Sequence, residues 1–352
     1  MLELSLLLVI IVVLVFPLLF RRIEENLEIF LFLMGIIAIF CAHFWGPLPV
    51  ISSQLLKESL VEPIKITLAV LIAGLLFNRF RSHITRKLLK IEERIGPQIF
   101  GLVLIIALGV LSSVITAIIA ALLLVEIISA LNLDRKFEIR LTIIACFSIG
   151  LGAALTSIGE PLSTIVVAKL RGAPYYADFL FFTKHLGVFI LPGIVGLGIL
   201  GAFFRGKEVI RNSLHQEKRE KLVHIFIRAG KVYLFIMALI FLGAGFKPII
   251  DMYITKLPAL VLYWVNLVSA ILDNATLAAA EISPKMTIDQ IRAALLGFLL
   301  AGGMLIPGNI PNIIAANKLK IRSKEWAQFG IPLGLAMRII YFLYLLSFDA
   351  TG

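Results

Sequence analysis

Apolar segments of about twenty residues recur along almost the whole chain, and they limit what the chain can fold into. A helix needs roughly 20 apolar residues to cross a bilayer, because each residue adds about 1.5 Å. Clear candidates occupy 2–20, 27–45, 60–78, 140–170, 176–204, 231–250, 288–319 and 326–347. Only 16% of the 352 residues are charged, against about 25% in a soluble domain. The sequence therefore predicts an all-α membrane protein with about eight transmembrane helices.

The first apolar run, Leu4–Phe20, is predicted to be a retained helix rather than a cleaved signal peptide. Glu3 precedes the run and Arg21-Arg22 follow it. A signal peptide has the opposite arrangement, with its positive charge before the apolar core. We therefore expect the chain to start outside and to enter the membrane through this helix.

Basic residues lie mainly in short segments between the apolar spans. With the N-terminus outside, the inside segments are 21–26, 79–96, 132–140, 205–231 and 318–324, and they hold 23 of the 33 lysines and arginines. Such an excess is typical of cytoplasmic loops. We therefore expect a multi-pass protein of the plasma membrane with both termini outside. The net charge of +11 then reflects membrane topology and does not indicate nucleic-acid binding.

Two further apolar stretches, 97–131 and 256–283, do not fit one span each. A single helix over 97–131 would be about 52 Å long, whereas the hydrocarbon core is about 30 Å thick. We interpret both stretches as re-entrant hairpins with short arms. Their predicted tips are Ser112-Ser113, with Thr116 close by, and Asp273-Asn274. Two ordinary short spans are the alternative for 97–131, with the same sidedness.

Two segments match without gaps over 15 residues. Thr156–Leu170 reads TSIGEPLSTIVVAKL and Leu305–Leu319 reads LIPGNIPNIIAANKL, so Glu160 aligns with Asn309. Each half of the chain has the order span, hairpin, interrupted long helix, span, and the charge pattern gives the halves opposite orientations. Chance similarity of two apolar, small-residue stretches is the alternative. Inverted repeats place ion and substrate sites near the middle of the membrane, at discontinuous helices.

Glu160 is a candidate ion ligand because an acid inside a membrane span is costly, at about 2.5–3.5 kcal/mol on insertion scales for a central Asp or Lys. Gly159 and Pro161 are expected to break the helix around it. The carboxylate, the carbonyls freed by the break and the hydroxyls of Thr156 and Ser157 would suit a small hard cation. The alternative is a structural glutamate that satisfies a kinked helix.

The second hairpin tip offers further oxygen ligands. Asp273 and Asn274 lie at this tip, with Ser269 and Thr276 beside them. The alternative is an Asx cap on the second arm. The remaining candidate ligands are the first-tip hydroxyls and the amides of PGNIPN, namely Ser112, Ser113, Thr116, Asn309 and Asn312. Hydroxyl bonding back to the helix and helix capping are their alternatives.

Five other charged or titratable residues lie in apolar segments. Lys184 and His185 are candidates for a counter-ion or a proton relay, although Lys184 could instead extend its charge to the interface. Glu126, Glu281 and Arg338 have either functional or structural roles. The sequence does not separate these two readings.

The chain resembles the ion-transporter superfamily at SAILDNATLAAA, TSIGEPLST and GGMLIPGNIPN. This superfamily includes sodium/proton antiporters, arsenite permeases and divalent anion/sodium symporters. The resemblance covers residues 57–352 and is greatest to a small prokaryotic family of predicted cation transporters. It implies a scaffold, a mobile transport domain with both hairpins, elevator-type motion and a homodimer. The chain departs from the symporters, which carry Ser-Asn-Thr at each tip, because its tips read Ser112-Ser113-Val114 and Asp273-Asn274.

The expected organisation has four parts. These are N-terminal scaffold helices (1–95), a first transport half (96–204, with hairpin 97–131 and interrupted helix 140–170), a basic cytoplasmic loop with a scaffold helix (205–250), and a second transport half (251–352, with hairpin 256–283 and interrupted helix 288–319).

The expected function is secondary transport, with Glu160 and Asp273 binding either Na⁺ or a proton in a sodium/proton antiporter. A sodium-coupled symporter of a small organic or inorganic anion and a passive ion channel are the alternatives. An enzyme is not expected, because the histidines are scattered and no HExxH or GxSxG motif occurs. No cofactor is expected beyond the transported Na⁺ and H⁺. The expected partners are the lipid bilayer, a monovalent cation, the proton and a second copy of the chain.

Overall fold

The computed structural model describes residues 2–24, 26–46, 49–131, 133–203, 222–270 and 274–349. These ranges contain no strands, and 84% of the chain is helical. Five of the described helices are long and apolar enough to cross a membrane: α3 (Leu27–Trp45), α5 (Pro97–Ile115), α9 (Phe181–Phe203), α10 (Leu222–Met252) and α15 (Ser323–Asp349). The predicted class, an all-α membrane protein, agrees with this architecture.

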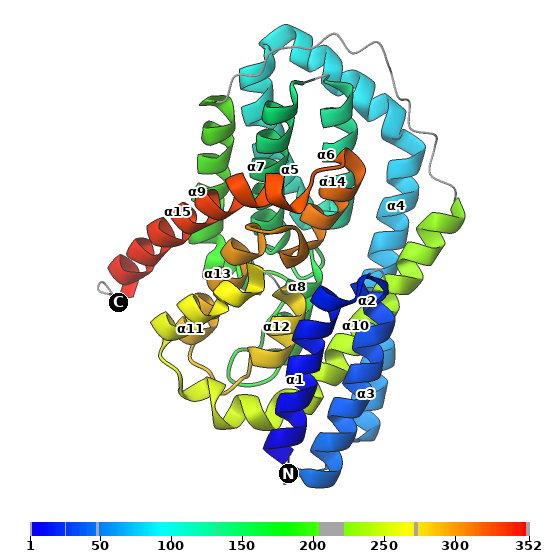
Figure 1. Cartoon of the computed structure of the whole chain (residues 1–352), viewed down its shortest axis with the longest axis vertical. Coiled ribbons are helices and arrows are strands. Elements are labelled where there is room, and N and C mark those ends of the chain that lie inside the picture. The colour runs from blue at the N-terminus through cyan, green and yellow to red at the C-terminus, as the bar shows by residue number, and fades with distance from the viewer. Residues whose placement is uncertain are drawn as a thin grey trace.

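One bundle occupies the lower part of Figure 1 and contains the N-terminal helices. Its members are α1 (Leu2–Leu19), α2 (Arg21–Glu24), α3, the first part of α4 (Ser53–Ile95) and α10. The α10 helix packs against both α3 and α4. Its contact with α3 is close, since a Cβ atom on Gly35 would lie 2.8 Å from Cβ of Phe241. Small residues in this contact let the two backbones approach, as is usual between membrane helices.

The α4 helix is much longer than the span predicted at 60–78. It continues without interruption to Ile95, through the segment 79–96 that we expected to be a loop. Its 43 residues extend about 64 Å. The segment 79–95 is rich in Arg, Lys, Leu and Glu and contains no Gly or Pro, so nothing in it stops a helix. The stop comes at Gly96, whose φ of 80° suits glycine.

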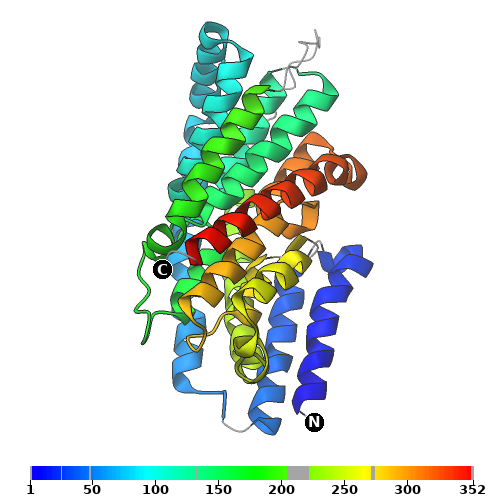
Figure 2. The same cartoon turned by 90° about the vertical axis from the view of Figure 1, so that its left-hand side faces the viewer.

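A second bundle occupies the upper part of both views, and the end of α4 lies across its top (Figures 1 and 2). It is formed by α5, α6 (Ala117–Ala130), α7 (Arg135–Ala153) and α9. The first predicted hairpin corresponds to α5 and α6. Of the three predicted tip residues, Thr116 lies at the turn, with a φ of 75°, whereas Ser112 and Ser113 lie within α5, which continues to Ile115. The first arm is also not short, since α5 has the 19 residues of a full span.

Both long helices that we expected to be interrupted are broken. The first consists of α7 and α8 (Pro161–Lys169), separated by non-helical residues 154–160. The second consists of α13 (Ile288–Gly302), a short 3₁₀ turn η3 (Ile306–Gly308) and α14 (Ile310–Leu319). A proline stands in the first turn of each short helix, where its missing N–H costs no hydrogen bond.

The second hairpin stretch is made of short pieces. They are η1 (Ile254–Lys256), α11 (Ala259–Val265), η2 (Asn266–Ala270) and α12 (Asn274–Glu281). Residues 271–273 lie outside the described part of the chain, so the structure gives no place for Asp273. Asn274, the other half of the predicted tip, begins α12.

Candidate functional site

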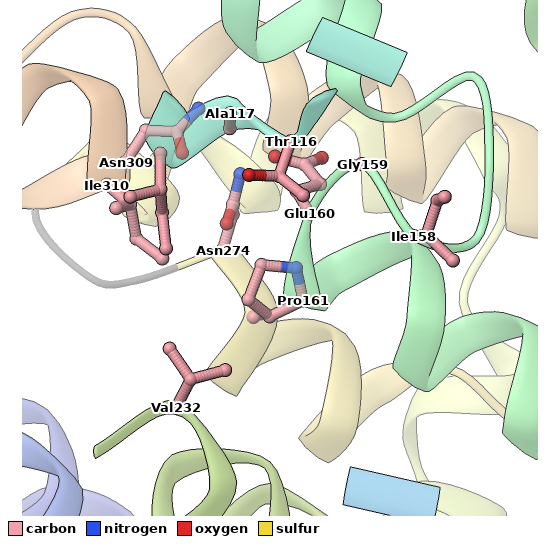
Figure 3. Close-up of a pocket in the computed structure, with 12 residues that line it drawn as sticks. Thr116, Ala117, Ile158, Gly159, Glu160, Pro161, Val232, Asn274, Asn309 and Ile310 are labelled. Atoms are coloured by element: carbon pink, nitrogen blue, oxygen red, sulfur yellow. The ribbon is translucent and has the colours of Figure 1, made fainter. Parts of the chain in front are cut away.

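The N-terminal ends of four helices meet at one pocket. Thr116, Glu160 and Asn309 are the N-cap residues of α6, α8 and α14, and Asn274 is the first residue of α12. All four line the pocket, and each is no more than 4% exposed. Figure 3 shows Thr116, Glu160 and Asn274 pointing toward one another, with Asn309 beside them. The cavity between them is small, with a volume of about 20 Å³, and Val232 of α10 lies on its far side.

Hydroxyl groups of α8 hold the chain break next to Glu160. The backbone of Glu160 is extended, with φ −151° and ψ 160°. Ser163 Oγ donates to the carbonyl of Thr156 (2.7 Å) and to that of Glu160 itself (3.0 Å). Thr164 Oγ1 donates to the carbonyl of Ser157. These bonds add hydroxyl donors to the carbonyls around the break, so they stabilise an interrupted backbone at this depth.

The second break is held in the same manner by an amide. Asn309 has nearly the same backbone conformation as Glu160, with φ −153° and ψ 147°. Asn312 Nδ2 donates to the carbonyls of Gly302 (2.8 Å) and Leu305 (2.9 Å). The Asn312 amide therefore stabilises the backbone at the break, in agreement with the alternative in which it caps a helix. Asn309 is the residue of this break that faces the pocket.

The first-tip serines do not reach the pocket. Ser112 Oγ donates to the carbonyls of Gly109 (2.6 Å) and Ile149 (3.0 Å), and Ser113 Oγ donates to that of Val110 (2.7 Å). The bonds to Gly109 and Val110 are the back-bonds to the helix that formed the alternative reading. They explain why the serines continue α5 instead of ending it. The bond from Ser112 to Ile149 joins α5 to α7.

Five other candidate ligands also lie outside the pocket lining: Thr156, Ser157, Ser269, Thr276 and Asn312. Thr156 Oγ1 donates to the carbonyl of Ser113, and Ser269 Oγ donates to that of Phe298 (3.3 Å). The Ser157 carbonyl accepts from Thr164. The side chains of Thr156, Ser269 and Asn312 thus bond to backbone carbonyls around the site. Four of the predicted ligands, Thr116, Glu160, Asn274 and Asn309, line the pocket.

Lys184, a candidate counter-ion, is paired with an exposed acid among the described residues. Its Nζ lies 2.5 Å from Oδ2 of Asp178, and both side chains are more than half exposed. The hydrogen bond from Lys184 holds the pKa of Asp178 below its usual value. The ring of His185 packs against Phe181, with 4.6 Å between ring centroids. Neither residue lines the pocket.

Two polar atoms near Glu160 are available to a ligand. Thr116 Oγ1 and Asn274 Nδ2 are buried and have no hydrogen-bond partner among the described residues. Buried polar atoms are almost always satisfied, so such a pair in one pocket indicates a bound ion, solute or water. The two ends of an amide have nearly the same shape, so Asn274 can present either its N–H or its oxygen.

Glycines of the long helices make room for the polar side chains. A Cβ atom on Gly150 of α7 would lie 2.6 Å from Nδ2 of Asn309. A Cβ atom on Gly302 of α13 would lie 3.4 Å from Nδ2 of Asn274. Since 2.6 Å is far inside van der Waals contact, Gly150 is required for the observed position of Asn309. Gly150 of the first half thus leaves the space that Asn309 of the second half occupies.

Arg338 has a structural place in the described fold. It is fully buried. Its guanidinium donates to the carbonyls of Gly297 (2.8 Å) and Tyr263, and it lies over the rings of Tyr263 (4.6 Å) and Trp264 (5.2 Å). These contacts join α15 to α11 and α13. Glu126 is only partly buried, on α6.

Two polar residues were not predicted from the sequence: Asn266, which is buried, and Lys169, which is half-buried. Asn266 donates to Glu281, and Lys169 donates to the carbonyl of Ala279. Asn266 is the one amide in the apolar run VLYWVNLVSA, which was a usable signal. Lys169 stands at the end of the apolar segment 140–170, where a charge does not stand out, so its position gave no signal.

The chemistry of the pocket is that of a hard-ligand site. Among the described residues that line it, Glu160 is the one acid. Four helix N-termini add partial positive charge, which stabilises an ionised carboxylate. Within the described ranges, no group of three or more His, Cys, Asp or Glu side chains is placed to hold a metal ion. Hydroxyl, amide and carboxylate oxygens are ligands for hard cations rather than for soft transition metals.

Comparison with known proteins identifies a family whose description names no activity. No curated protein matches the chain. One family matches residues 3–348, which is nearly the whole sequence. The chain therefore belongs to the family described as "Protein of unknown function (DUF1646)".

Proposed function

We propose that this protein is a secondary active transporter of the plasma membrane that exchanges a monovalent cation, Na⁺, for protons. The observation that carries the proposal is the pocket at which Thr116, Glu160, Asn274 and Asn309 meet. The four residues come from four separate helices, and each stands at a helix start. Transporters build their ion sites at such discontinuous helices.

The exchange follows from competition for one carboxylate. A proton on Glu160 removes the negative charge that holds a cation, so the carboxyl group carries either H⁺ or Na⁺. The Thr116 hydroxyl and the amide oxygens of Asn274 and Asn309 then complete the cation site. Asp273 precedes Asn274 in the sequence and is the second acid of the proposal, although it lies outside the described residues.

The finer architecture is part of the same proposal. We propose that the two halves are inverted repeats of the ion-transporter superfamily, that the chain dimerises, and that the transport halves move against the scaffold helices like an elevator. The backbone likeness of Glu160 and Asn309 supports the repeat. So do the bonds from Ser163 to Thr156 and from Asn312 to Leu305, each to the carbonyl seven residues earlier.

A second candidate function is a sodium-coupled symporter of a small anion. The specific observation in its favour is the convergence of four helix N-termini, because their free N–H groups and positive dipole ends bind anions. The Thr116 hydroxyl and the Asn274 amide can also donate to an anion. In this reading, Glu160 would hold the coupling Na⁺ beside the anion.

Transport by purified protein in liposomes with a trapped pH dye separates these functions. An outward proton gradient is imposed, and Na⁺, Li⁺, K⁺ and Ca²⁺ are added in turn. Exchange predicts that Na⁺ dissipates the gradient, with saturation, without added anion. The symporter predicts instead that radiolabelled dicarboxylate or oxyanion accumulates only with Na⁺. A passive channel predicts cation flux that does not move protons.

Variants connect the flux to the pocket. Glu160→Gln removes the titrating group while keeping the shape of the side chain, and it should abolish exchange. Glu58→Gln is the matched control, because Glu58 is exposed near the start of α4 and accepts a hydrogen bond only from Gln54 within the described residues. Wild-type exchange by Glu160→Gln would refute the carboxylate mechanism.

A further inference from the structure

A second buried acid lies at the opposite end of α12 from the pocket. Glu281, the last residue of α12, is only 8% exposed. Its Oε1 accepts a hydrogen bond from Nδ2 of Asn266 (2.8 Å), and Asn266 is itself buried. An amide N–H can donate to a carboxylate and to a protonated carboxyl group alike. This hydrogen bond therefore does not fix Glu281 in one charge state.

The other acids near this end of α12 have charged partners of their own. Asp251 of α10 is paired with Lys285 (2.7 Å) and accepts a hydrogen bond from Ser283 (2.9 Å). On α13, Asp289 is paired with Arg292 (2.7 Å). Glu281 has no cation within ion-pairing distance among the described residues. Glu281 differs from the neighbouring acids because the donor bonded to it, the Asn266 amide, is neutral.

Lys169 is the cation whose charge acts on Glu281 from a longer distance. Its Nζ donates to the carbonyl of Ala279 (2.5 Å), where it caps the C-terminal end of α12. The charges of Lys247 and Asp251, both on α10, act in turn on Lys169. The charge state of Glu281 is thus balanced between burial, which favours the neutral acid, and the Asn266 hydrogen bond together with the Lys169 charge, which favour the carboxylate.

Two short helices connect this acid to the pocket. The α8 and α12 helices pack against each other. Their N-terminal ends carry Glu160 and Asn274 at the pocket, and their C-terminal ends carry Lys169 and Glu281. Eight residues of α12 separate the two ends by about 12 Å. A ligand that moves the start of α12 against α8 therefore also changes the spacing of Lys169 and Glu281.

The C-terminal end of α12 belongs to the side of the molecule on which the chain begins. The bond from Ser283 ties it to Asp251 at the end of α10. Tyr253, just beyond α10, donates to Glu3 in the first turn of α1 (3.0 Å). In Figure 1 the start of α1 lies at the bottom, away from the bundle of α5, α6, α7 and α9.

We propose that Glu281 is a second proton-binding site, which exchanges protons with the aqueous phase on the side where α1 begins. In the binding step, water delivers a proton to a carboxylate oxygen of Glu281, and the carboxylate becomes a neutral acid that keeps its bond to Asn266. The connection of this site to ion exchange rests on the proposed function, whereas the binding of a proton by Glu281 does not depend on it.

Infrared difference spectroscopy between acid and alkaline pH tests the site on the full chain in lipid vesicles. A protonated carboxyl group gives a carbonyl stretching band that disappears on ionisation. We expect one titrating band to be missing from Glu281→Gln and retained in the control Asp289→Asn, whose acid is exposed. An unchanged set of titrating bands in Glu281→Gln overturns the proposal.

Lys169→Met provides a second test that leaves Glu281 in place. Loss of the ammonium charge removes a force that favours the carboxylate, so the titration midpoint of the band should move to higher pH. A midpoint that stays unchanged contradicts the proposed balance. Both measurements are independent of transport, so they remain decisive even if the vesicles show no Na⁺/H⁺ exchange. If exchange is present, Glu281→Gln should shift its pH profile and leave the Na⁺ concentration for half-maximal rate unchanged.

Discussion

Alanine substitutions of three glycines test the packing that shapes the pocket. In Gly150→Ala the new Cβ would lie 2.6 Å from Nδ2 of Asn309. Ordinary contact begins near 3.4 Å, so the amide must retreat by about 0.8 Å. This amide is the free end of a side chain, so the fold can absorb the change at a cost of about 1–3 kcal/mol.

The same displacement should weaken ion binding. A hydrogen bond or dipole contact to a charged group contributes about 1.5–3 kcal/mol. Its loss corresponds to a weakening of Na⁺ affinity by roughly 10- to 150-fold. We therefore expect Gly150→Ala to be folded and to bind Na⁺ poorly, as measured by the Na⁺ dependence of exchange and by titration of purified protein.

Two matched variants separate this effect from general damage. In Gly152→Ala the Cβ would lie 1.7 Å from the backbone oxygen of Gly109, which no rotamer change can relieve. It should be destabilised by more than about 3 kcal/mol, or fail to fold. Gly196→Ala meets nothing within 4 Å and should behave as wild type. Wild-type Na⁺ affinity in Gly150→Ala would refute the assignment of Asn309 as a ligand, and a stable Gly152→Ala would refute the packing of α5 on α7.

Three further substitutions have expected outcomes. Arg338→Met removes the hydrogen-bond donors of two buried carbonyls, so it should lower the free energy of unfolding by about 2–5 kcal/mol, seen as a lower melting temperature in detergent. An unchanged melting temperature would contradict the role of Arg338 in joining α15 to α11 and α13. Asn312→Leu removes the hydrogen bond to the carbonyl of Leu305 and should lower the free energy of unfolding by about 1–3 kcal/mol in the same assay. It should also lower Na⁺ affinity, because the helix break next to Asn309 moves. Unchanged stability would show that this helix break does not depend on Asn312. Lys184→Ala breaks an exposed pair with Asp178 worth about 0–1 kcal/mol, so exchange should be retained, whereas its loss would restore the counter-ion hypothesis.

Local chemistry made the helix breaks predictable. Gly159-Glu160-Pro161 and the PGNIPN sequence interrupt a helix through properties of single residues, and both helices are broken there. The apolar lengths similarly located α3, α9 and α15 to within a few residues. These features depend on residues that are neighbours in the chain.

The positions that were missed depend on contacts between distant segments. The turn at Thr116 is fixed where the N–H of Ala117 donates to the carbonyl of Gly159 (2.8 Å), a bond to another part of the chain. The nearby Ser112 satisfies its own hydroxyl within α5, so its polarity wrongly suggested a tip. The partnership of Asn266 with Glu281 likewise requires the folded hairpin.

The same difference between local and long-range contacts applies to the pocket. The sequence named twelve possible ligands and placed Glu160 and Asp273 first, but it did not separate the rest, because a hydroxyl can either face a ligand or bond to a carbonyl. Only tertiary structure decides between these uses. It directs Thr116 and Asn274 into the pocket, and it directs Ser112, Ser113 and Asn312 to backbone carbonyls.

Proton release on Na⁺ binding tests the central claim most directly. Na⁺ is added to purified protein in a weakly buffered solution, and the pH is followed together with Na⁺ binding. Competition at Glu160 predicts that the wild-type protein acidifies the medium as Na⁺ binds, and that acid pH weakens binding. Glu160→Gln should lose this Na⁺-dependent release, while Glu58→Gln should keep it. Na⁺ binding with no proton release, or release of equal size from Glu160→Gln, would contradict the account.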